Sequence, residues 1–122
     1  LLIEALERYH KFYGDDFTVE CPVGSGQFMN LQQVALEIGH RIASLFLKTK
    51  TGFAPWQEGQ EALFASEHCR DLHLFYEHFH ADSGRGLGAS HQTGWTALIT
   101  RLFDDFVRRE NYSQSGTEGK GK

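Results

Sequence analysis

The sequence has few cysteines, the residues that cross-link many small proteins, and it lacks a long apolar run. Its two cysteines, Cys21 and Cys69, form neither a disulfide framework nor a C-x-x-C zinc motif. No apolar stretch approaches the roughly 20 residues that a membrane helix needs. No charged-then-apolar leader opens the chain. We therefore expect no membrane partner, and a reducing compartment, the cytoplasm, is the simplest location.

The charge balance gives no indication of a polyanionic partner. The formal net charge of the 122 residues is -4, so no broad basic surface indicates binding to nucleic acid or to an anionic membrane. The length fits one modest domain. The chain begins within a helical pattern, without a methionine or a capping residue, which we interpret as the sign of a fragment of a longer chain.

Apolar periodicity predicts an all-α fold with about three long amphipathic helices. The first prediction is residues 2–13, and Gly14 is its stop signal. The second is residues 31–48, with Asn30 as the N-cap. The third is residues 92–109. A further helical turn or two is expected near 61–69, between long loops at 15–29 and 49–60. The polar residues 112–122 should form a disordered tail.

One carboxylate in the segment 74–96 is a candidate for acid–base chemistry. Glu77 lies within an aromatic run that contains Phe75, Tyr76 and Phe79. A carboxylate walled by aromatic rings is partly desolvated, which makes it a better proton acceptor. The alternative is an ordinary surface glutamate on a half-buried segment, which for an arbitrary glutamate is the commoner case.

The residues after Glu77 allow both a functional and a structural interpretation. Gly84, Gly86 and Gly88 would let backbone approach a ligand closely, or would simply make an irregular turn. The segment 91–96, His-Gln-Thr-Gly-Trp-Thr, places polar residues beside a tryptophan at a helix start, which suits a hydroxyl-rich ligand or a cap with a core tryptophan.

Metal binding and nucleophilic catalysis are weaker alternatives. Five histidines and one cysteine lie within residues 68–91: His68, Cys69, His73, His78, His80 and His91. They lack the H-E-x-x-H and C-x-x-C spacings of common zinc sites. Ser90 precedes His91, but no G-x-S-x-G elbow surrounds it.

Two longer stretches carry a resemblance to a known family. Residues 74–80, Leu-Phe-Tyr-Glu-His-Phe-His, and residues 84–98, Gly-Arg-Gly-Leu-Gly-Ala-Ser-His-Gln-Thr-Gly-Trp-Thr-Ala-Leu, resemble the C-terminal signature of glycoside hydrolase family 63. The similarity is greatest to its bacterial glucosidase-like and mannosylglycerate-hydrolase-like branch. Residues 1–6 and 19–26 also resemble that branch, so the resemblance covers roughly residues 1–110.

The resemblance implies a fold and an activity. Residues 1–111 would be the C-terminal portion of an (α/α)6 barrel that hydrolyses α-glycosidic bonds with inversion and needs no cofactor. Glu77 matches the family's general base. Tyr76 and Trp95 would stack on sugar faces, and His91 or Gln92 would hold water or sugar hydroxyls. The substrate would be a carbohydrate, and the remainder of the barrel, upstream of Leu1, would be the chain's partner.

The sequence also departs from the family. The general acid and a tryptophan-rich loop of the family lie upstream of Leu1, so the isolated chain is expected to be inactive. Residues 53–69 differ from the branch, with Ala-Pro-Trp-Gln-Glu-Gly at 54–59 and Cys69 at the place of a tryptophan. A non-catalytic helical module, or a remnant of the barrel, is the alternative to a catalytic piece.

Overall fold

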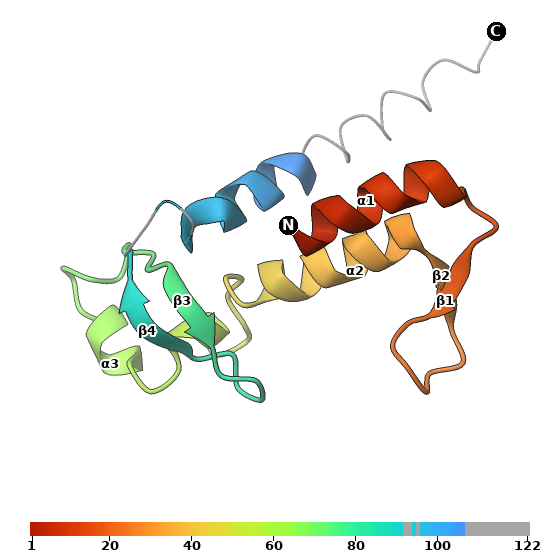
Figure 1. Cartoon of the computed structure of the whole chain (residues 1–122). Coiled ribbons are helices and arrows are strands. Elements are labelled where there is room, and N and C mark those ends of the chain that lie inside the picture. The colour runs from red at the N-terminus through yellow and green to blue at the C-terminus, as the bar shows by residue number, and fades with distance from the viewer. Residues whose placement is uncertain (92–93, 95, 107–122) are drawn as a thin grey trace, which may run out of the picture. The chain divides into compact units, whose positions relative to one another are not determined.

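The structure, a computed structural model, describes residues 1–91, 94 and 96–106 of the chain (Figure 1). The chain divides into two compact units, Leu1–Ile42 and Ala43–Lys122. None of the helices in the described part combines the length and the apolar character that crossing a membrane would require.

The first unit begins with helix α1, Leu2–Tyr13, where the apolar periodicity predicts a helix. Gly14 ends the helix with a positive φ of 73°, and its N–H donates to the carbonyl of His10 at 2.8 Å. No residue of α1 is buried, and Phe12 on its apolar stripe is 80 % exposed. The helix is therefore correctly predicted, but its apolar face is exposed to solvent in this chain.

A small hairpin follows α1 in the same unit. Strands β1, Thr18–Glu20, and β2, Phe28–Asn30, pair antiparallel with Val19 opposite Met29. The loop between them is closed by the Cys21 N–H, which donates to the carbonyl of Gln27 at 2.9 Å. The segment expected to be a structureless loop is thus an ordered hairpin.

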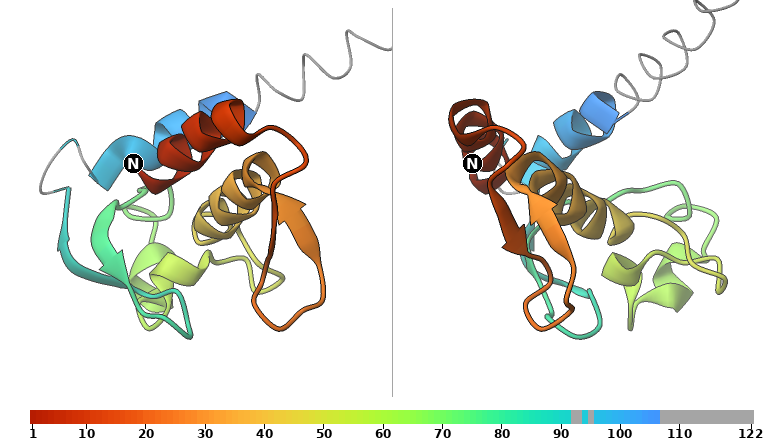
Figure 2. Two further views of the ribbon diagram at one scale, coloured as in Figure 1. Left: turned by 45° about the vertical axis from the view of Figure 1, so that its right-hand side comes forward. Right: turned by 90° about the vertical axis from the view of Figure 1, so that its right-hand side faces the viewer.

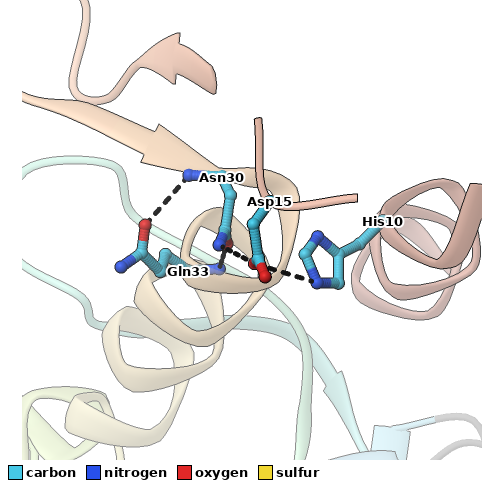
Figure 3. A network of polar contacts seen from close by, with 4 residues as sticks. All are labelled: His10, Asp15, Asn30 and Gln33. Atoms are coloured by element: carbon cyan, nitrogen blue, oxygen red, sulfur yellow. Dashed lines mark hydrogen bonds and ion pairs between the residues drawn. The ribbon is translucent and has the colours of Figure 1, made fainter. Parts of the chain in front are cut away.

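Helix α2, Leu31–Ser44, starts at the predicted cap. The Gln33 N–H donates to Asn30 Oδ1 at 2.9 Å, and the Asn30 N–H donates to Gln33 Oε1 at 2.9 Å (Figure 3). This reciprocal pair satisfies two backbone donors at once, as in a capping box. The helix buries Leu31, Val34 and Ala35.

α2 ends four residues earlier than the periodicity predicts. Phe46 N–H donates to the Ala43 carbonyl, and Leu47 N–H to the Ser44 carbonyl, so the final turn tightens to i→i+3 bonds. The Leu45 carbonyl then accepts from the Trp56 N–H at 3.2 Å. This tertiary bond takes an acceptor that a longer helix would have used.

The second unit is built on a core around Trp56. The 3-10 turn η1, Pro55–Gln57, and the short helix α3, Glu61–Phe64, bring the Trp56 and Phe64 rings edge to face at 4.8 Å. Trp56 is 2 % exposed. Half-buried residues pack against this cluster: Phe46, Phe53, Cys69, Leu74, Tyr76 and Phe79. The segment in which the sequence departs from the resembling family is therefore the structural centre of this unit.

A second hairpin lies beside α3 in this unit (Figures 1 and 2). It pairs β3, Tyr76–Phe79, antiparallel with β4, Gly86–Ser90. After it come the 3-10 turn η2, Thr96–Leu98, and a helix over residues 99–106. The predicted third helix is thus seen in its middle; residues 92, 93, 95 and 107–109, and the predicted tail 112–122, lie outside the described residues.

The predicted fold class is wrong. The described chain is mixed α/β, with two separate two-stranded antiparallel sheets, and not an all-α piece of an (α/α)6 barrel. The three-residue strands of the first hairpin are too short to show a period of two. In the second hairpin, glycines replace the apolar residues that would mark a strand.

Candidate functional site

The candidate site is the β3–β4 hairpin, where the pairing is interrupted opposite Glu77. Tyr76 pairs with Ser90, whereas His78 pairs with Leu87. One residue of β3, Glu77, therefore faces two residues of β4, Gly88 and Ala89. This arrangement is a β-bulge, a feature found often next to active sites, where it redirects a side chain.

The bulge holds the Glu77 carboxylate in a defined place. The Ala89 N–H donates to Glu77 Oε2 at 3.1 Å. Gly88 adopts a positive φ of 77°, and a Cβ added there would lie 2.5 Å from the same Oε2. The carboxylate therefore lies directly over the space that a side chain at position 88 would fill.

Glu77 is exposed, and the aromatic walls expected from the sequence do not enclose it. Tyr76 and Phe79 are half-buried in the Trp56 core. The Phe75 ring lies 5.9 Å from that of Phe46, measured between centroids. The desolvation expected from the aromatic run is therefore not seen among the described residues, because these rings pack against Phe46 and the Trp56 core while the Glu77 side chain stays exposed.

Tyr76 occupies a structural position in this unit. Its hydroxyl donates to Gln60 Oε1 at 3.4 Å, and its ring lies 6.2 Å from that of Trp56. A Cβ on Gly86 would lie 2.2 Å from the Tyr76 ring. The close backbone approach at Gly86 thus serves the chain's own tyrosine, and the predicted stacking of Tyr76 on a sugar stays a prediction.

His91 closes the open end of the hairpin. Its N–H donates to the Phe75 carbonyl at 2.8 Å, and its Nε2 accepts from the Phe75 N–H at 3.4 Å. It has a φ of 55°, which is uncommon for a residue other than glycine. The side chain is exposed, so it remains accessible for the predicted contact with a sugar hydroxyl or water. The other two predicted sugar contacts, Gln92 and Trp95, lie outside the described residues.

The histidines do not form a metal site where the structure describes them. Within residues 1–91, 94 and 96–106, no three His, Cys, Asp or Glu side chains come together. His80 has a structural role, since its Nδ1 accepts from the N–H groups of Asp82 and Ser83 at 3.3 and 3.4 Å. The metal-binding alternative therefore gains no support.

Backbone N–H groups lower the pKa values of two carboxylates outside the β3–β4 hairpin. The pKa of Glu20 is lowered from its ordinary value, first by the Gly26 N–H and then by that of Gly24. The pKa of Glu61 is lowered by its own N–H and then by that of Gly59. Both carboxylates organise local turns, which is a structural use of a charged group.

A separate groove lies in the first unit. It has a volume of about 360 Å³ and is lined by Gln27, Phe28, Met29, Gln33, Leu36, Glu37 and His40. The groove is open to solvent. Its lining residues belong to the first unit, whereas Glu77 belongs to the second, so the groove is not part of the candidate site.

The sequence indicated Glu77 and the glycines at 84, 86 and 88 as candidates, but not the Ala89 N–H that binds the Glu77 carboxylate or the space that Gly88 leaves beside it. The available signal was a glycine repeated at every second position, Gly84, Gly86 and Gly88, in a segment bounded by aromatic residues. A glycine inside a strand often marks a bulge or a close approach.

The chain is similar to a protein of Saccharomyces cerevisiae described as "Uncharacterized protein YMR196W". The two are 48 % identical over 107 residues, a match that covers 86 % of this chain and 10 % of the yeast protein. This chain thus spans about a tenth of the length of that curated relative. No family model matches the chain, and no solved structure matches it.

Proposed function

We propose that this chain is the part of an inverting glycoside hydrolase that supplies the general base, Glu77, for cleavage of an α-glucosidic or related α-glycosidic bond. The observation that carries the proposal is the Glu77 carboxylate at the β-bulge, exposed and bound through Oε2 by the Ala89 N–H. The resemblance of residues 74–80 and 84–98 to glycoside hydrolase family 63 supplies the reaction.

The geometry of Glu77 suits the activation of water. An inverting glycosidase needs a carboxylate that deprotonates a water molecule on the face of the sugar opposite the leaving group. Glu77 is exposed, so water can reach it, and one carboxylate oxygen is held by a backbone donor. The other oxygen would accept the proton.

The second carboxyl group comes from elsewhere in a longer protein. The general acid of an inverting pair lies roughly 6.5–9.5 Å from the base, which leaves room for the water. The resemblance places that acid outside this chain, so the isolated chain is inactive under this proposal. The similarity of the chain to about a tenth of a longer yeast protein is consistent with such a division.

The partners are a carbohydrate and the rest of a catalytic domain, with no nucleic acid and no cofactor. His91, Gln92 and Trp95 would contact the sugar. A cytoplasmic location is part of the proposal, and the free thiols of Cys21 and Cys69 are compatible with a reducing compartment.

The test is Glu77→Gln in the full-length protein. Hydrolysis of α-glucosides should fall by roughly 10²–10⁴-fold, the usual contribution of a general base. Proton NMR of the wild-type reaction should show the β-anomer of the released sugar first, as inversion requires. Glu67→Gln is the matched control, because Glu67 is another exposed glutamate of the same unit. Turnover of Glu77→Gln equal to that of Glu67→Gln would refute the role of Glu77.

A non-catalytic module is the competing interpretation, since an exposed glutamate is also what a surface position would show. Such a module would bind a saccharide without turnover, or bind none. The full-length protein would be titrated with an α-glucoside in a calorimeter, and the mixture would then be analysed for products. Absence of hydrolysis products would favour the non-catalytic module over the hydrolase.

A further inference from the structure

We propose that the bulge residues Gly88 and Ala89 are positioning residues for Glu77: Gly88 leaves the space that the carboxylate occupies, and the Ala89 N–H fixes which oxygen faces the water. The inference rests on the proposed function, and it deepens that function by assigning roles to two residues that carry no reactive group.

The first observation is the register of the hairpin. If β3 and β4 paired without interruption, the residue opposite Glu77 would donate or accept bonds in the ladder. Instead, the extra residue of β4 leaves the Ala89 N–H directed to a side chain, and it donates to Glu77 Oε2 at 3.1 Å. A backbone donor cannot rotate away as a side chain can, so the strand itself offers the carboxylate a donor at a set position.

The second observation is the steric condition at Gly88. Its φ of 77° lies in the left-handed region, where glycine has no steric penalty. A Cβ at this position would lie 2.5 Å from Glu77 Oε2 and 3.1 Å from His78 Cε1. The carboxylate would have to move, because an atom pair at 2.5 Å is far inside van der Waals contact.

Both features act on the same oxygen, Oε2: the Ala89 N–H binds it, and a Cβ at position 88 would displace it. With Oε2 held by the Ala89 N–H, Oε1 is the oxygen that takes the proton from water as the water oxygen forms its bond to the sugar carbon. A small displacement of the carboxylate would weaken this step without touching the groups that bind the sugar, since misplacement by about 1 Å can cost on the order of 10²-fold in rate.

The experiment compares three variants in the full-length protein with an α-glucoside substrate. Gly88→Ala introduces the Cβ, and Ala89→Pro removes the N–H donor. Gly52→Ala is the control, because Gly52 also has a positive φ, 85°, but a Cβ there meets nothing within 4 Å. The control therefore measures the cost of the left-handed conformation alone.

The expected result is a loss of about 10- to 100-fold in kcat for Gly88→Ala and Ala89→Pro, with KM little changed and with no such loss for Gly52→Ala. The loss should persist with an aryl α-glucoside whose leaving group needs no protonation, because the base step is still required. Equal kcat for Gly88→Ala and Gly52→Ala, or a defect confined to KM, would overturn the inference.

A readout independent of activity separates the inference from the proposed function. In a crystal structure of the full-length Gly88→Ala protein, the Glu77 carboxylate should lie beyond hydrogen-bonding distance of the Ala89 nitrogen. An unmoved carboxylate would refute the positioning role even if Glu77→Gln is inactive. A moved carboxylate with an unaffected Glu77→Gln enzyme would instead retain the positioning and refute the assignment of the base.

Discussion

The Asn30 side-chain amide donates from Nδ2 to Asp15 Oδ1 at 2.8 Å, while its Oδ1 accepts from the Gln33 N–H (Figure 3). One side chain thus caps helix α2 and binds the segment that leaves helix α1. His10 Nε2 lies 3.7 Å from the same Asp15 oxygen and forms an ion pair with it when protonated. The cap of one helix is therefore connected through Asp15 to the end of the other.

The double use of Asn30 leads to a prediction about local stability. Asn30→Ala removes both bonds and should destabilise the start of α2 by about 1 kcal/mol, the usual cost of losing an N-cap. Asn30→Ser keeps an acceptor for the Gln33 N–H but loses the donor to Asp15, so its cost should be smaller. Native-state hydrogen exchange of the α2 peptide measures both. Equal protection in the two variants would show that the cap acceptor for the Gln33 N–H adds no measurable stability beyond the bond to Asp15.

The loop of the first hairpin should open in acid. Glu20 Oε1 accepts from the Gly26 N–H at 2.7 Å, and this bond, followed by that from Gly24, lowers the pKa of Glu20 below its ordinary value of 4.5. Because the folded pKa is the lower one, the bonds contribute stability in full above about pH 4.5 and lose it as the pH falls through the folded pKa. Exchange protection of residues 21–27 should therefore fall with acid.

The control for this pH dependence is Glu20→Gln, which keeps an oxygen acceptor but cannot titrate. Its loop protection, corrected for the intrinsic exchange rate, should be weaker near neutral pH and flat across the acid range. Glu67→Gln should behave as the wild type, because Glu67 lies outside the loop. The same acid transition in Glu20→Gln would assign the opening to another group.

Helices were predictable from this sequence because their signals are local. Residues 2–13 form a helix with the expected Gly14 stop, and Asn30 caps the next one through Gln33, three residues away. The end of α2 was not predictable. It depends on the bond from the Trp56 N–H to the Leu45 carbonyl, which joins residues far apart in the chain.

The hairpins were not predictable because their strands carry little local signal. Thr18–Glu20 and Phe28–Asn30 are three residues each, and β4 contains two glycines. The sequence did indicate Glu77 as the group of interest. It could not indicate the surroundings of Glu77, because residues adjacent in the chain, such as Tyr76, are directed into the core by the strand, while Ala89 is brought to the carboxylate by the register.

The exposed face of α1 leads to the last prediction. Leu2, Tyr9 and Phe12 lie on one stripe of the helix and are 62 %, 58 % and 80 % exposed. An apolar face of this kind in a marginally stable chain favours loose structure and association. The 122-residue chain expressed alone should therefore bind a hydrophobic dye such as ANS and melt over a broad range.

The substitution Phe12→Ser decides whether the stripe is covered in the full-length protein. In the isolated chain it should reduce dye binding and change stability by no more than about 0.5 kcal/mol, since an exposed side chain loses little on replacement. In the full-length protein it should cost about 2–4 kcal/mol if the stripe packs against another part of that protein, because burial would make Phe12 a core residue. Glu7→Gln, a polar position on the same helix, should be near neutral in both. A sharp cooperative melt of the isolated chain as a monomer, together with a neutral Phe12→Ser in the full-length protein, would show that α1 needs no covering partner.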